Sequence, residues 1–179
     1  LQTTIQQKMT EEMQSTIHAG IDSFFKQMRQ NPSALSSALE KKGLQNADYY
    51  LGGASFGGRT ALRHGQLYPG TFKGYISHDG AIAKRNFGFS DAITPVLHLN
   101  DTQEPVLILQ NCDDNNVDVM TAVDFYQALI DAGKSHLARL CFFEKGNPMP
   151  TGEDKWNKGH FYPEHELSRY LDNIWRFMD

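Results

Sequence analysis

The chain has 179 residues, of which 40% are hydrophobic and 21% are charged, and its formal net charge is −4. This length is enough for one domain with a sizeable core, and the composition is that of an ordinary globular protein. The acidic balance gives no basic surface, so no nucleic acid partner is expected. No apolar run approaches the roughly 20 residues of a membrane-spanning helix, and no signal-peptide pattern opens the sequence. A cytoplasmic protein is the default expectation, with a secreted parent as the alternative.

The sequence contains two cysteines, Cys112 and Cys141. Two are too few for a structural zinc site or a disulfide framework. We interpret them as buried free thiols, with a single bridge between them as the alternative.

The first part of the chain has helical patterns. A first, longer helix is predicted to begin after Thr10 and to end at Asn31-Pro32. A second helix is predicted over 33–42 and ends at Gly43. The longer helix is predicted from apolar residues at helical spacing, namely Met13, Ile17, Ile21, Phe24, Phe25 and Met28.

Short apolar runs and helical patterns then alternate along the chain. Alternation of this kind predicts right-handed crossovers and a parallel sheet, with a site at the carboxyl ends of the strands. We interpret the apolar stripe of the last helix as core packing. Strands are predicted at 49–51, 72–77, 105–109 and 137–143, helices at 60–67 and 120–132, and a final helix with the stripe Leu167, Tyr170, Leu171, Ile174, Trp175 and Met178.

A glycine-rich turn follows the first predicted strand. The segment Gly53-Ala54-Ser55-Phe56-Gly57 has the pattern G-x-S-x-G, which places a nucleophilic serine on a sharp turn between a strand and a helix. The residues two positions away from Ser55 must be small, because the strand and the helix approach closely there. The N–H of Phe56 is then expected to point at a developing oxyanion. This pattern predicts Ser55 as the nucleophile and Phe56 as an oxyanion-hole donor.

Two more candidate side chains follow later strands. Asp114 lies after the strand at 105–109, where a carboxylate can orient a histidine, and His160 lies in a loop before the last helix, where a general base fits. Asp79, after the second strand, is an alternative carboxylate. We favour Asp114 and expect the adjacent Asp113 to point away, since two carboxylates facing one imidazole repel each other.

The nucleophile region resembles that of the α/β-hydrolases, especially the prolyl-oligopeptidase-like and related esterase groups. In those groups the serine turn often has the pattern G-G-S-x-G-G, followed by a helix, a Tyr-Pro pair and a strand with Phe-Lys. The equivalents in this sequence are 53–58, Tyr68-Pro69 and Phe72-Lys73. The chain order of Ser55, Asp114 and His160 is also the order of this family.

The regions of the acid and the histidine extend the resemblance. The segment 105–117 is similar to the family's strand followed by H-G-x-x-D-x-x-V, in which Asp114 and Val117 fit but Gln110-Asn111 replace His-Gly. The triplet around His160 resembles the family's histidine loop. The resemblance is weakest over 81–103, a segment where such hydrolases can carry a pocket-lining insertion.

The resemblance implies a partial α/β-hydrolase fold of about four parallel strands flanked by helices, with the N-terminal strands absent. The chain 1–179 is then the C-terminal part of a single hydrolase domain. The implied activity is cleavage of a small-molecule ester or a peptide-like amide by a Ser-His-Asp acyl-enzyme mechanism, without a cofactor or metal. Because the family's second oxyanion donor lies on an earlier loop, we expect a fragment to be impaired. The open sheet edge would also allow a homo-oligomer.

Two other classes of protein compete with this interpretation. The segment 53–60 matches the phosphate-binding pattern G-x-x-x-x-G-K-[ST] except that Arg59 replaces lysine, and Asp79 would then be a magnesium-binding acid. This nucleotide-binding alternative leaves Asp114 and His160 without a role. The other alternative is a hydrolase-fold module that binds ligands without catalysis.

Overall fold

The computed structural model describes residues 40–44, 46–84, 89–147 and 159–179. The chain divides into two compact units, Leu1–Ala47 and Asp48–Asp179, and all of the candidate site residues belong to the second. The helix predicted over 10–31 lies outside the described residues, as does most of the helix predicted over 33–42. None of the helices in the described ranges is long and apolar enough to cross a membrane.

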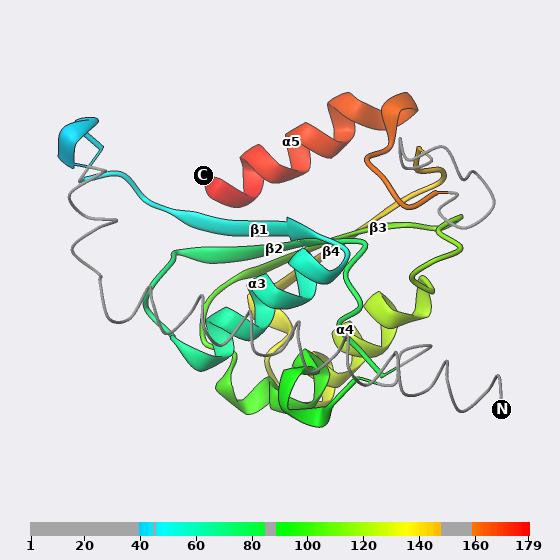
Figure 1. Cartoon of the computed structure of the whole chain (residues 1–179), viewed down its shortest axis with the longest axis horizontal. Coiled ribbons are helices and arrows are strands. Elements are labelled where there is room, and N and C mark those ends of the chain that lie inside the picture. Colours follow the sequence, from blue (N-terminus) through cyan, green and yellow to red (C-terminus); the bar gives the residue numbers. More distant parts are fainter. Residues whose placement is uncertain (1–39, 45, 85–88, 148–158) are drawn as a thin grey trace, which may run out of the picture. The chain divides into compact units, whose positions relative to one another are not determined.

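The second unit contains a sheet of four parallel strands in the order β1-β2-β3-β4 (Figure 1). Helix α3 connects β1 to β2, α4 connects β3 to β4, and α5 follows β4. The predicted parallel sheet with flanking helices is confirmed. Its elements are β1 (Tyr50–Ala54), α3 (Phe56–Leu67), β2 (Gly74–His78), β3 (Val106–Asn111), α4 (Met120–Asp131), β4 (Ala138–Phe143) and α5 (Leu167–Met178).

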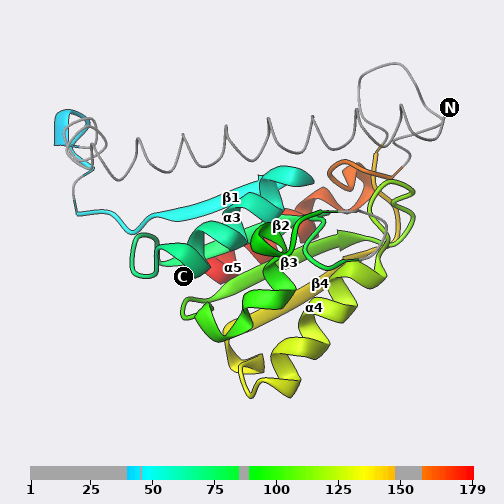
Figure 2. The ribbon, with the colours of Figure 1, turned by 60° about the horizontal axis from the view of Figure 1, so that its bottom comes forward.

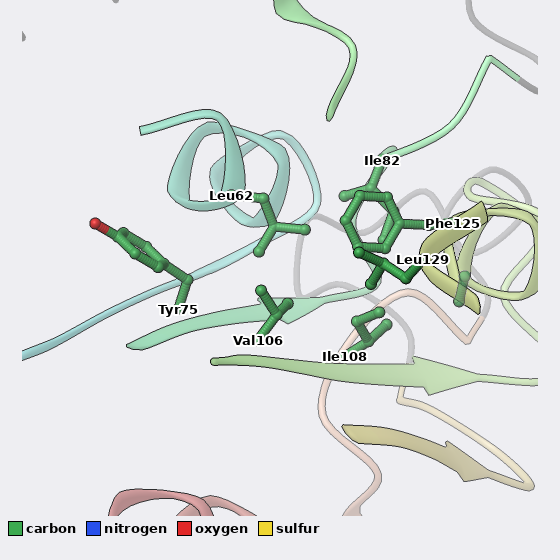
Figure 3. Packing of buried hydrophobic residues seen from close by; sticks show 8 residues of the cluster. Leu62, Tyr75, Ile82, Val106, Ile108, Phe125 and Leu129 are labelled. Atoms are coloured by element: carbon green, nitrogen blue, oxygen red, sulfur yellow. The ribbon is translucent and has the colours of Figure 1, made fainter. Parts of the chain in front are cut away.

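The helices cover both faces of the sheet, with α3 and α4 on one face and α5 on the other (Figures 1 and 2). Successive residues of a strand point to opposite faces. Val106 and Ile108 of β3 therefore pack against α3 and α4, where Phe125 fills the space between them (Figure 3). Leu107 and Leu109 pack toward α5. A strand buried on both faces explains the continuous apolar run that predicted β3.

Helix α5 is present as predicted, but its apolar stripe is not wholly buried against the core. Its Tyr170 and Ile174 pack against the second core cluster together with Phe177. Leu171 and Trp175, by contrast, are 44% and 63% exposed, and Leu167 is exposed as well. The interpretation of the whole stripe as core packing is therefore wrong, because the helix turns only one edge of that stripe toward the sheet.

Both cysteines are free thiols. Cys112 is exposed, and Cys141 is partly buried with its Sγ donating to the Asn173 Oδ1 at 3.0 Å. The alternative of a bridge is excluded in this structure, and the expectation that both thiols are buried is wrong. Cys112 is exposed because it comes directly after the last residue of β3, where the chain leaves the sheet.

Candidate active site

Ser55 lies on a strained turn between β1 and α3. Its φ is 54° and its ψ is −122°, a conformation that non-glycine residues rarely adopt and that costs on the order of 1–3 kcal/mol. Two backbone hydrogen bonds fix the turn: the Ser55 N–H donates to the His78 oxygen at 2.8 Å, and the Arg59 N–H donates to the Ser55 oxygen at 3.3 Å. The serine is thus held at the carboxyl edge of the sheet.

The glycines of this turn have different roles. A Cβ on Gly53 would overlap the backbone of Gly57, so the strand can approach the helix only with glycine at position 53. A Cβ on Gly58 would meet the Ser77 Oγ at 2.6 Å, whereas a Cβ on Gly57 would meet no atom within 4 Å. The close approach of the strand and the helix therefore requires glycine at positions 53 and 58. At position 57 there is space for a side chain, and only the backbone of Gly57 takes part in the contact.

Phe56 is the first residue of α3. The N–H groups of the first helical turn have no acceptor within their own helix, so the Phe56 N–H has no intrahelical partner. The Phe56 ring lies 6.2 Å from the ring of Phe89, measured between centroids. The segment predicted to shape a pocket therefore reaches the serine turn.

Asp114 and His160 form a buried pair. The His160 Nδ1 lies 2.6 Å from the Asp114 Oδ2, and the two side chains are 2% and 0% exposed. The other oxygen, Oδ1, accepts the N–H groups of Asn116 and Val117 at 2.8 and 3.0 Å. An ionised carboxylate can only accept, so Nδ1 carries the proton and Nε2 is left as the basic nitrogen.

The electrostatic surroundings raise the pKa of His160. Burial lowers this pKa, but the hydrogen bond to Asp114 and the negative charges of Asp114 and Asp79 outweigh that effect. The imidazolium form is therefore stabilised, as a base that accepts a proton during a reaction requires.

Of the four predicted site residues, the structure brings Asp114 and His160 into direct contact. Ser55 follows β1 and Asp114 follows β3, so both lie at the carboxyl edge of the sheet. The side chains of Ser55 and His160, both described, share no hydrogen bond in this structure. Such a bond is often long before substrate binds. Asp113 points away from His160, as expected, and its Oδ1 accepts the Gly146 N–H at 2.8 Å.

Asp79 is a buried third member of this region. Donor atoms of Asp79, Asp114 and His160 lie within 4.8 Å of one another, a spacing that a metal ion could use. Both carboxylates already accept N–H groups at hydrogen-bond distance, so the geometry favours a hydrogen-bonded network. Burial raises the pKa of Asp79, although His78 and the Asn111 N–H oppose this shift.

Arg59 lies one helical turn after Ser55 and is 1% exposed. Its guanidinium carbon lies 3.5 Å from the centroid of the Phe89 ring, and its three side-chain nitrogens have no hydrogen-bond partner. Burial lowers its pKa to about 10. A phosphate-binding loop would need an open loop at 53–58, but Gly53 lies in β1 and 56–58 lie in α3. The nucleotide-binding alternative is therefore not favoured.

The described fold is part of an α/β-hydrolase fold, and solved structures of such proteins match it. Dipeptidyl peptidase 4 of Porphyromonas gingivalis matches with a TM-score of 0.56 and 18% identity, over 72% of this chain and 19% of the peptidase. An acylaminoacyl peptidase in complex with a chloromethyl ketone matches with a TM-score of 0.56 and 19% identity, over 81% and 26% of the two chains.

A protein described as a dienelactone hydrolase of Klebsiella pneumoniae also matches, with a TM-score of 0.55 and 18% identity, over 72% of this chain and 50% of that one. The chain thus spans between about a fifth and a half of the length of these three structures. No family model and no curated relative matches the sequence. The resemblance noted in the sequence is confirmed at the level of the fold.

Proposed function

We propose that the protein is a serine hydrolase that cleaves an ester or a peptide-like amide by acyl transfer. The observation that carries this proposal is the placement of a strained Ser55 turn at the same sheet edge as the buried His160–Asp114 pair. A nucleophile, a base and a carboxylate that orients the base are the parts that this chemistry needs.

In the proposed reaction, Ser55 attacks the carbonyl carbon and His160 Nε2 takes the hydroxyl proton. Asp114 holds the imidazole in the correct tautomer and stabilises the imidazolium that forms. The Phe56 N–H stabilises the oxyanion, His160 returns the proton to the leaving group, and water then releases the acyl group by the same route. The second oxyanion donor of this fold comes from a loop after an earlier strand.

The substrate is proposed only as a class. Phe89 lies beside Phe56 and stacks on Arg59, and these contacts support an apolar wall at the serine turn. The matching structures include peptidases and a hydrolase of a lactone by their names, which is consistent with either an ester or an amide.

A substrate panel tests this proposal. The purified protein is assayed against p-nitrophenyl esters of increasing chain length and against amino-acyl and dipeptidyl amides. We expect turnover of at least one class, lowered by about 1,000-fold or more in Ser55→Ala. Ser168→Ala, which removes an exposed serine of α5 in the same unit, is the matched control and should keep full activity.

The rival in the same fold is a module that binds ligands without catalysis. It predicts no turnover of any panel member and unchanged ligand binding in Ser55→Ala. Equal turnover by wild type and Ser55→Ala would reject the assignment of Ser55 as the nucleophile.

A further inference from the structure

Asn111, the last residue of β3, connects this strand to two segments that are far away in the sequence. Its buried side-chain nitrogen donates to the Asp79 Oδ2 at 2.6 Å, the Gly159 oxygen at 2.9 Å and the Phe161 oxygen at 2.7 Å. Its main-chain N–H donates to the Asp79 Oδ1 at 2.7 Å. Asp79 therefore holds Asn111 through both oxygens, and Asn111 holds the carbonyls immediately before and after His160.

The surroundings determine the orientation of the Asn111 amide. Two N–H bonds serve three oxygen acceptors, so one hydrogen is shared. The opposite orientation would set the amide oxygen against three other oxygens. In the observed orientation the Asn111 Oδ1 is buried without a hydrogen-bond partner. An unsatisfied buried oxygen costs free energy. The hydrogen bonds that the amide nitrogen donates to the histidine loop offset this cost.

Two glycines let the loops close around this amide. A Cβ on Gly146 would overlap both the Asn111 Nδ2 and the Gly159 oxygen. Gly159 has a φ of 73°, and a Cβ there would lie 2.5 Å from the Asp113 oxygen. The loops after β3 and β4 and the loop of His160 therefore meet at Asn111 with no space for larger residues.

We propose that Asn111, held by Asp79, is a positioning residue for His160. This inference rests on the proposed function and adds to it. By fixing the carbonyls on both sides of His160, the amide sets where the imidazole stands relative to Asp114 and Ser55. In the family that the sequence resembles, a glycine occupies this position of the H-G-x-x-D-x-x-V pattern. Glycine has no side-chain amide and cannot form these hydrogen bonds.

The test compares Asn111→Ala and Gly146→Ala with wild type. We measure kcat and KM for the ester that wild type cleaves best, the rate of covalent labelling by a fluorophosphonate probe, and thermal unfolding. Displacing a catalytic group by about 1 Å can cost about 100-fold in rate, so kcat and the labelling rate should fall by about that factor while KM changes by less than about threefold. Asn173→Ala, which removes a structural asparagine of α5, is the control and should keep its kcat.

All rates are taken at a temperature where the unfolding curves show each variant to be folded, so that loss of folded protein does not count as loss of rate. If Asn111→Ala folds and keeps the wild-type kcat and labelling rate, the positioning role is wrong. Labelling of Ser55 in both proteins would then still support the proposed function. If wild type is not labelled at Ser55, the proposed function itself fails. If Asn111→Ala does not fold, the kcat and labelling rate of Gly146→Ala test the positioning role instead. A positioning role predicts folded proteins with slow turnover, so failure of both variants to fold would also contradict it.

Discussion

Asp114 uses one oxygen to hold His160 and the other to accept two backbone N–H groups, which fixes the carboxylate in place. Asp114→Asn keeps the shape but allows the wrong imidazole tautomer, so kcat should fall by about 10³- to 10⁴-fold. Steady-state turnover of the best substrate measures this loss. Asp113→Asn removes the adjacent carboxylate, which does not bond His160, and should change kcat by less than about tenfold. Equal effects of the two substitutions would contradict the assignment of the acid.

The charge of Asp79 bears on pH dependence, because it contributes to the raised pKa of His160. A base must be neutral to accept a proton, so kcat/KM should rise with pH through that pKa, which lies above its ordinary value of about 6.5. Removing the negative charge in Asp79→Asn should lower the His160 pKa and move the rising limb to lower pH. The pH profile of both proteins measures this, and a limb that stays in place or moves upward would refute the electrostatic role of Asp79.

The sequence selected some residues of the candidate site and missed others for physical reasons. Ser55, Asp114 and His160 could be selected because each follows a strand and because their order matches a known pattern, and their catalytic roles stay predictions. Asn111 was noted only as a departure from that pattern. Its role depends on contacts with residues 32, 48 and 50 positions away, which no local pattern contains. The one available signal was two polar residues that directly extend an apolar strand.

The glycines of the turn between β1 and α3 are expected to differ in their effect on stability. Gly53→Ala forces a Cβ against the backbone of Gly57, so it should lower the free energy of unfolding by about 3 kcal/mol. Gly57→Ala meets open space near the helix start and should change it by less than about 1 kcal/mol. Denaturant unfolding of the two variants compares them. Similar losses would show that the strand and the helix are not in the close contact described.

Helix α5 allows a second comparison within one element. The Phe177 ring packs on the sheet beside Gly74 and lies 5.8 Å from the ring of Tyr50, whereas Trp175 is 63% exposed. Phe177→Ala should therefore cost about 2 kcal/mol of stability, and Trp175→Ala about 0.5 kcal/mol or less. Thermal unfolding in parallel decides between these values. A larger loss for Trp175→Ala would mean that the exposed stripe of α5 is covered in solution.

The elements themselves were largely predictable, with errors at their ends. Helix α3 begins at Phe56, whereas the pattern predicted a start at position 60, because the glycines between these positions carry no apolar periodicity. Strand β3 continues for two residues beyond the predicted 109, since Gln110 and Asn111 are polar yet fully buried. In both cases tertiary contacts overrode the local composition.

At the scale of the whole molecule, the four described strands form only part of a hydrolase sheet. Among them β1 pairs with β2 alone, and its residues Gly52 and Ala54 are exposed. An open edge of this kind can pair with another strand. The proposed homo-oligomer would use this edge, and sedimentation velocity measures the oligomeric state directly. A concentration-independent monomer would reject it.

Covalent reaction of Ser55 tests most directly whether this serine is the activated nucleophile that we propose. The protein is incubated with a fluorophosphonate probe, digested, and mapped by mass spectrometry. One probe should attach per chain, on the peptide that contains Ser55, and the labelling should disappear in Ser55→Ala and slow strongly in His160→Ala. Labelling of another residue, or undiminished labelling of Ser55→Ala, would contradict the account.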